Sequence, residues 1–386
     1  MTAAVQRAYR PDLEYHSERA DGLLASASDG TEAAVAAFER WGAPVSAEGA
    51  RLVVAREHGL PDWEMFRAHL AGLGDDPFVR AYRAVEAHDV DGLRSLLDEF
   101  PQLPGERGTN GNDLLGMAGA TCDERLVELL LERGSDPSAA NSHGWTALHQ
   151  AAYVGLPRLA RTLLDAGAPV EVSARGDGGT PLIVALFWGH RETAELLAEG
   201  GVAPRNLRAA AGLGRVELVE ELAGGTGESP AGAHRAFYRP HSGFPPWRPS
   251  GDPQEVLDEA LSWAARNDRP DAIEALTAHG AALDADVYRG TALTWAAACG
   301  RVAAIERLLA LGADPNRRGT FGGPSHGEGV TALHLAAESG SLDAIRALLD
   351  GGADPSIRDA NHGGTPADWA AHAGRREAEE VLRAAG

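Results

Sequence analysis

The strongest constraint in this sequence is a motif that recurs every 34 residues. NDLLGMAGA (112–120), TALHQAAYVG (146–155) and TPLIVALFWG (180–189) start 34 residues apart, and the same interval separates TALHLAAESG (331–340) from TPADWAAHAG (365–374). A fixed period of this length is typical of repeat proteins, in which each repeat is one supersecondary unit. We therefore expect the chain to fold as a stack of similar units.

Each copy carries the signals of two short helices. In one copy, Thr331 stands where it can cap a helix, and Gly340 stands where that helix ends in a left-handed turn. A second apolar stretch follows, with Ile345, Leu348 and Leu349 on one face at helical spacing. The sequence Gly-Ala-Asp-Pro then predicts the end of the second helix and a projecting turn.

This pattern, TPLHxAA…G…LLLxxGADxN, resembles that of ankyrin repeats. The resemblance covers about 78–386, with degenerate copies at 78–100, 207–223 and 255–283, and we count about nine units. It implies an all-α solenoid of helix-turn-helix units. Such arrays serve mostly as scaffolds that bind other proteins.

The array departs from its own period at two places, which divides the chain into four segments. We expect an N-terminal helical cap segment at 1–77, repeats 1–5 at 78–223, a finger insertion at 224–254, and repeats 6–9 at 255–386 with a second finger insertion at 315–330. The cap segment contains helical stretches at 31–41 and 49–70, broken by Gly-Leu-Pro-Asp at 59–62. Its expected role is to cover the first repeat.

Composition excludes several classes of function. The net charge is −21, and all 35 basic residues are arginines. This charge argues against general nucleic-acid or membrane binding, and the absence of lysine excludes Walker A, Schiff-base and kinase-type chemistry. No metal-binding or cofactor-binding motif is present, so we expect no metal and no cofactor. Arginine bias favours a bacterial source, and the absence of a signal peptide or a long apolar run favours the cytoplasm.

Two cysteines stand far apart in helical patterns. Cys122 and Cys299 are therefore expected to be buried thiols rather than a disulfide.

The first insertion, HRAFYRPHSGFPPWRPS at 234–250, is unlike any other part of the chain. Prolines argue against a long helix, and the exposure of four aromatic residues favours an ordered lid over a solvated linker. Arginine side chains beside aromatic rings suit the binding of a partner or an anion. From this insertion we predict the contact residues Arg235, Phe237, Tyr238, Arg239, Phe244, Trp247 and Arg248.

Further contact residues are expected elsewhere along the array. The second insertion contributes Phe321 and His326. By the resemblance, residues just before the glycine that ends each first helix face the groove of the array. Those predicted to contact a partner are Tyr153, Phe187, Trp188, Arg266 and His372.

Histidines and tryptophans within the repeats are predicted to be structural. The resemblance implies that His149 and His334 form a hydrogen bond near the helix start. Trp263, Trp295 and Trp369 recur at one repeat position, where other copies have Leu or Val, so packing between repeats is the expected role.

Two functions remain open from the sequence, beside a purely structural role in which the first insertion only covers a weak repeat junction near 207–223. The first is a binding protein that captures a protein or peptide on its concave face, with the fingers at 234–250 and 317–328 as the main contacts. The second is a small-molecule binding protein or a metal-free enzyme, with a pocket between the two fingers for an anionic or polar substrate. Its candidate acid–base residues are His234, His241, Asp286, Tyr288, His326 and Glu328.

Overall fold

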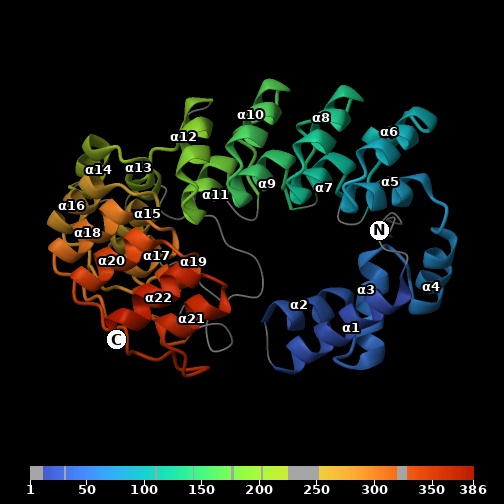
Figure 1. Ribbon diagram of the computed structural model, residues 1–386. Coiled ribbons are helices and arrows are strands. Elements are labelled where there is room, and N and C mark those ends of the chain that lie inside the picture. Colours follow the sequence, from blue (N-terminus) through green and yellow to red (C-terminus); the bar gives the residue numbers. More distant parts are fainter. Residues whose placement is uncertain are drawn as a thin grey trace. The chain divides into compact units, whose positions relative to one another are not determined.

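A computed structural model describes residues 12–29, 32–108, 111–141, 143–174, 178–200, 203–224, 252–319 and 328–386. Within these ranges the regular secondary structure is helical, apart from two isolated β-bridges (Figure 1). The predicted all-α fold is therefore confirmed for this part of the chain. Residues 225–251 of the first predicted finger insertion and 320–327 of the second fall outside the described residues.

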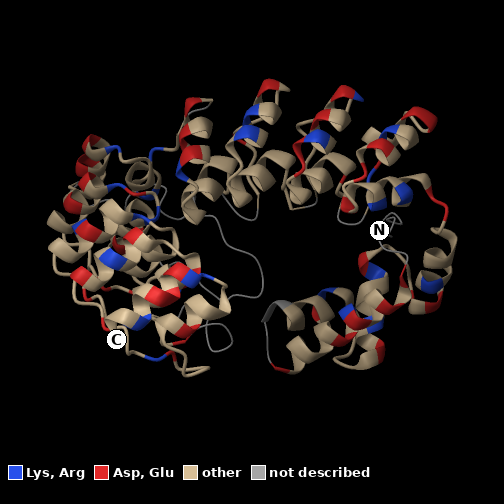
Figure 2. Ribbon diagram, in the orientation of Figure 1, with Lys and Arg blue, Asp and Glu red and all other residues tan. Residues whose placement is uncertain are grey.

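The chain divides into two compact units. One comprises Met1–Ala151 and Arg161–Pro169, and the other comprises Ala152–Ala160 and Val170–Gly386. The boundary falls within the pair formed by α9 (Ala147–Val154) and α10 (Pro157–Asp165). Figure 2 shows that acidic residues are spread along the helices of both units, as expected from the net charge of −21.

The first unit begins with four helices that share a hydrophobic core. They are α1 (Leu13–Ser28), α2 (Glu32–Trp41), α3 (Ala47–Glu57) and α4 (Trp63–Gly72). Phe38, Val53 and Phe66 are at most 1% exposed in this core. The predicted break at 59–62 is confirmed, since Asp62 caps α4 by accepting a 2.8 Å hydrogen bond from the amide of Met65. The sequence analysis did not identify α1, whose buried residues are only His16, Ala20 and Ala27.

Two helix pairs follow in the first unit. These are α5 (Pro77–Glu86) with α6 (Val90–Glu99), and α7 (Leu114–Thr121) with α8 (Glu124–Glu132). Cys122 ends α7 in the left-handed conformation, with φ of 61°. This places its side chain at an exposed turn, so the prediction of a buried thiol is wrong for Cys122.

Two buried histidines lie in the N-terminal core. The rings of His16 and His58 pack against Phe66, with centroid distances of 4.9 and 4.7 Å. His58 is 1% exposed, and its Nδ1 lies 2.8 Å from the carbonyl oxygen of Val54. Burial lowers the pKa of His58 from 6.5 to about 4, although the hydrogen bond to Val54 opposes this shift. His58 is therefore neutral in the folded protein at neutral pH.

Acid is expected to destabilise this core. Because the pKa of His58 is lower in the folded state, the unfolded state binds more protons below about pH 6.5, and stability is lost as the pH falls toward 4. The loss from His58 at pH 5 is about 2 kcal/mol. Hydrogen exchange of peptides from α3 and α4, corrected for the intrinsic rate, measures it. In a His58→Gln protein the free energy of unfolding of this core should differ less between pH 8 and pH 5, by about 2 kcal/mol. An unchanged difference would contradict the role assigned to His58.

The second unit continues as helix pairs. In chain order these are α11 (Pro181–Trp188) and α12 (Arg191–Glu199), α13 (Leu207–Leu213) and α14 (Val216–Ala223), α15 (Pro253–Arg266) and α16 (Pro270–Ala278), α17 (Ala292–Ala298) and α18 (Val302–Ala310), α19 (Ala332–Ser339) and α20 (Leu342–Asp350), and α21 (Pro366–His372) and α22 (Arg376–Ala385). First helices pack on first helices from α15 to α21, and second helices pack on second helices from α14 to α22.

Small residues allow this close stacking. Ala264, Ala296, Ala336 and Ala370 lie in successive first helices, and each has an exposed fraction of 0%. The first helices can therefore approach closely. Gly340 ends α19 with φ of 77°, so the predicted left-handed turn is confirmed.

Candidate functional site

Eleven of the predicted site residues lie outside the described residues. They are His234, Arg235, Phe237, Tyr238, Arg239, His241, Phe244, Trp247, Arg248, Phe321 and His326. Those that the structure describes are Tyr153, Phe187, Trp188, Arg266, Asp286, Tyr288, Glu328 and His372.

Arg266 lies at the centre of an aromatic cluster in the second unit. Its guanidinium carbon is 4.6 Å from the ring centroid of Phe187 and 3.8 Å from that of Trp295. Its Nη1 donates a 2.6 Å hydrogen bond to the carbonyl oxygen of Phe187, and its Nε and Nη2 donate to Ser262 Oγ at 3.2 and 3.0 Å. Burial lowers the pKa of Arg266 to about 10, so the side chain remains charged at neutral pH.

This cluster corrects two predictions. Phe187 and Arg266 were expected to face an open groove, but their exposed fractions are 0% and 1%. The reason is that α15 packs directly against α11 as well as against α13, which encloses both side chains. Trp188 and Tyr153 remain accessible; their rings meet edge to face at 5.4 Å, and Tyr153 is 39% exposed.

The predicted acid–base residues that the structure describes have different surroundings. Tyr288 is 4% exposed and stacks on Trp295 with a centroid distance of 6.1 Å. Burial raises the pKa of Tyr288, so its hydroxyl stays protonated at neutral pH and is poorly suited to act as a base. Asp286 and Glu328 are exposed.

The structural role predicted for two histidines is confirmed. His149 Nδ1 lies 2.8 Å from Thr146 Oγ1 and accepts a 3.2 Å hydrogen bond from the amide of Thr146. His334 makes the same contacts with Thr331, at 2.9 and 3.1 Å. Each histidine therefore fixes the start of a first helix.

The three repeated tryptophans have two kinds of environment. Trp263 and Trp295 are 1% and 3% exposed, which confirms packing as their role. Trp369 is half-buried, and its Nε1 donates a 3.0 Å hydrogen bond to Asp359 Oδ2. Burial favours a higher pKa for Asp359, but hydrogen bonds from His362, Trp369 and Gly364 outweigh it and hold this pKa at about 2. A permanent carboxylate thus orients the indole ring of Trp369.

A cleft of about 770 Å³ lies beside Trp369 in the second unit. Its walls come from the ends of α19 and α21 and from the turn that precedes α21. The lining residues are Glu338, Arg358, His362, Gly363, Gly364, Asp368, Trp369, His372 and Ala373. His372 was predicted as a contact residue; the sequence analysis assigned Trp369 to packing only.

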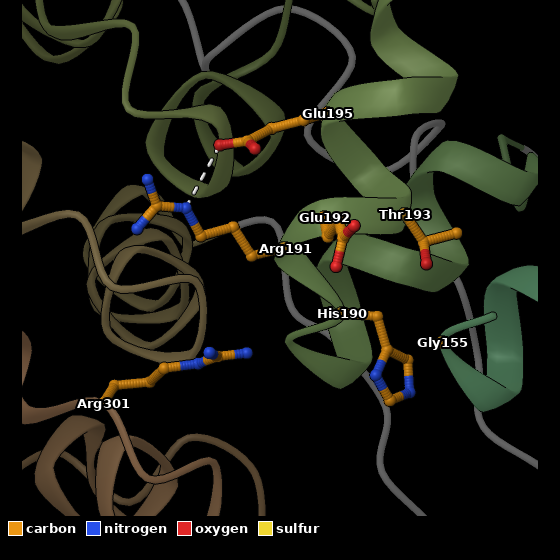
Figure 3. A pocket seen from close by; sticks show the side chains of 7 residues that line it. All are labelled: Gly155, His190, Arg191, Glu192, Thr193, Glu195 and Arg301. Atoms are coloured by element: carbon orange, nitrogen blue, oxygen red, sulfur yellow. Dashed lines mark hydrogen bonds and ion pairs between the residues drawn. The ribbon is translucent and has the colours of Figure 1, made fainter. Parts of the chain in front are cut away.

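A smaller pocket of about 290 Å³ lies at the start of α12, also in the second unit (Figure 3). It is lined by Gly155, His190, Arg191, Glu192, Thr193, Glu195 and Arg301. The sequence analysis missed it, although the polar Thr193 stands where other copies of the repeat have an apolar residue.

Among the described residues no group of three His, Cys, Asp or Glu side chains is arranged to hold a metal ion. No helix in the described ranges is long and apolar enough to cross a membrane.

A family model of ankyrin repeats, in three copies, matches residues 114–206, 207–319 and 321–386. The chain belongs to the ankyrin-repeat family. Ankyrin repeats generally mediate binding between proteins. The Thr-His contacts and the stacked pairs of short helices are thus family features in this chain.

Curated relatives resemble parts of this ankyrin-repeat chain. B-cell lymphoma 3 protein of Homo sapiens is 34% identical over 134 residues, which cover 33% of this chain and 29% of the relative. NF-kappa-B inhibitor delta of Mus musculus is 30% identical over 139 residues, or 33% of this chain and 42% of the relative. Protein PhlB of Serratia liquefaciens is 38% identical over 87 residues, which cover 22% of this chain and 38% of the relative. The matches therefore span less than half of each of these relatives.

Proposed function

We propose that this ankyrin-repeat protein binds a protein or peptide partner, and that the cleft beside Trp369 is one of its contact surfaces. The observation that carries this proposal is the contrast between two parts of the second unit. Around Arg266 the side chains expected to face the groove are buried, whereas at α19 and α21 a half-buried tryptophan borders an open cleft. Tryptophan is enriched at the centres of protein interfaces.

Polar groups around the cleft support the binding of an extended segment. Glu338 and His372 lie at the ends of α19 and α21, and Arg358 and His362 lie on the turn before α21. They offer donors and acceptors around an aromatic surface, as binding clefts commonly do. One of the relatives is named as an inhibitor of NF-kappa-B, which agrees with protein binding as the class of function. We also propose the insertions at 234–250 and 317–328 as contacts, and this part of the proposal rests on their sequence alone.

Substitutions of two cleft residues provide the test. Partners are captured from extract of the source organism with the wild type, with His372→Glu and with Trp369→Ala, and identified by native mass spectrometry. His372 is exposed, so its substitution by glutamate should leave the fold intact while adding a negative charge to the cleft. Arg346→Glu is the matched control, because this side chain is 58% exposed on α20 and does not line the cleft.

We expect one partner to be retained by the wild type and the control, and to be lost at least tenfold in both cleft variants, a factor worth about 1.4 kcal/mol. A partner that binds all four proteins equally would contradict the assignment of the cleft. A retained small molecule with no protein would contradict protein binding itself.

A further inference from the structure

The pocket at the start of α12 contains a buried hydroxyl group. Thr193 is 1% exposed, and its Oγ1 has no hydrogen-bond partner among the described residues. Buried hydroxyl groups are rarely left unpaired, because the lost hydration costs about 1–3 kcal/mol. Thr193 lines the pocket, so a ligand there could receive this hydrogen bond (Figure 3).

Comparison with the other repeats makes Thr193 exceptional. It is the third residue of α12, a second helix of its pair. At this position the helices α8, α10, α14, α16, α18, α20 and α22 have the apolar residues Leu126, Leu159, Leu218, Ala272, Ala304, Ala344 and Ala378. Functional sites in repeat proteins are expected where one copy departs from the others.

The structure also contains a carboxylate at the equivalent place in another repeat. At α18, Asp268 Oδ1 accepts a 2.9 Å hydrogen bond from the amide of Ala304, the third residue of that helix. Asp268 lies in the turn of the preceding pair. For α12 the corresponding turn residue is Gly155, which has no side chain, and no acceptor for the Thr193 amide occurs within the described ranges. The N-terminus of α12 thus lacks the oxygen acceptor that α18 has.

The charged side chains that line the pocket at this N-terminus are two arginines, Arg191 and Arg301, and two glutamates, Glu192 and Glu195. Arg301 Nε donates a 2.9 Å hydrogen bond to the carbonyl oxygen of Arg266, and its Nη2 donates at 2.5 Å to that of Gly189. These bonds hold its guanidinium beside the pocket, opposite the start of α12 (Figure 3). His190 precedes the helix and makes no side-chain cap, because its Nε2 donates to the carbonyl oxygen of Tyr153 at 2.9 Å.

Three carboxylates oppose this positive charge, and one of them, Asp268, has its Oδ2 3.8 Å from Arg191 Nη1. Glu195 Oε1 is 3.1 Å from Arg191 Nε and 2.7 Å from Arg269 Nη2, so two arginines share its charge. Glu192 is exposed at the second position of α12 and contributes an opposing charge at the rim.

We propose that this pocket binds a small oxyanion, namely a phosphate or carboxylate group, on the N-terminus of α12. The amide and hydroxyl of Thr193 donate hydrogen bonds to it, and Arg301 supplies positive charge. The N-terminal end of a helix favours such a group through its free amides and its dipole. The site is separate from the cleft beside Trp369 and does not depend on the proposed protein-binding function.

The test is a titration of the full chain with inorganic phosphate, and separately with acetate, at constant ionic strength. The amide resonance of Thr193, assigned from its loss in Thr193→Val, is followed by nuclear magnetic resonance. A saturable shift is the expected result. Tighter binding of phosphate identifies a phosphate site and tighter binding of acetate a carboxylate site, and either supports an oxyanion site; no saturable shift with either probe overturns the proposal.

Variants separate this site from general charge effects, with binding followed through the ring resonances of His190. Thr193→Val restores the apolar character of the other repeats and should weaken binding at least about tenfold, as for one lost hydrogen bond to a charged group. Glu192→Gln alters only an exposed side chain and should strengthen binding about two- to threefold. Arg346→Gln, away from the pocket, should change nothing. Equal affinity in the wild type, Thr193→Val and Glu192→Gln would overturn the proposal, and the Glu192 variant keeps the test valid if Thr193→Val fails to fold.

Discussion

Replacement of Arg208 by methionine is expected to destabilise the second unit by about 3–5 kcal/mol. Arg208 of α13 forms an ion pair with Glu259 of α15, and the two side chains are 1% and 2% exposed. Removal of the arginine leaves a buried carboxylate without its cation, and this is among the most costly changes that a single substitution can make. Urea denaturation followed by circular dichroism measures the change.

The stability lost in Arg208→Met should depend on pH, which gives a sharper prediction. Burial raises the pKa of Glu259 to about 7, although the charge of Arg208 opposes the shift. A raised pKa means that the folded state favours the protonated carboxyl group, so stability from this group is present at low pH and is lost as the pH rises through 7. Without Arg208 this preference should increase. The loss caused by Arg208→Met should therefore be smaller at pH 5 than at pH 8.

A double variant is the control for this pair. Arg208→Met with Glu259→Met replaces both charges by apolar side chains of similar length and should recover most of the lost stability. If the single variant is as stable as the wild type at pH 8, or if the double variant is the less stable of the two, the ion pair does not have the role assigned to it.

The parts of the fold that could be predicted are those that local sequence determines. The period of 34 residues, the caps at Thr146 and Thr331 and the left-handed Gly340 all depend on residues within one repeat. For this reason the roles of His149 and His334 were also predictable. Helix α1 was missed because its buried face consists of His16, Ala20 and Ala27, which give only a weak apolar signal.

The parts that could not be predicted depend on contacts between distant repeats. Phe187 and Arg266 occupy the positions expected at an open groove. They are nevertheless buried, because α11 packs against α15 although α12, α13 and α14 intervene in the sequence. No periodic pattern contains this information. The pocket at Thr193 is an intermediate case: alignment of the copies could have found the threonine, but only the structure reveals that its hydroxyl is buried and unpaired within the described residues.

Arg266→Ala is expected to cost about 3–5 kcal/mol of the stability of the second unit, comparable to the loss of a large core side chain. The substitution removes the hydrogen bond to the carbonyl oxygen of Phe187, leaves a cavity between Phe187 and Trp295, and ends the stacking on both rings. The lost hydrogen bond, the cavity and the lost stacking each lower the stability of the folded state. Because Arg266, the last residue of α15, contacts both α11 and α17, its loss should also loosen the packing of these three helices.

Conservative variants determine which property of Arg266 matters. Arg266→Met retains an apolar stem and should recover part of the packing, whereas Arg266→Lys retains the charge but not the planar group that stacks and donates several bonds. If planar stacking is decisive, lysine should be no better than methionine, and hydrogen exchange should rise in α11 and α17 but not in α21 and α22. Arg346→Ala, at a 58% exposed side chain, should change stability by less than about 0.5 kcal/mol. Wild-type stability in Arg266→Lys would show instead that the charge alone stabilises this cluster.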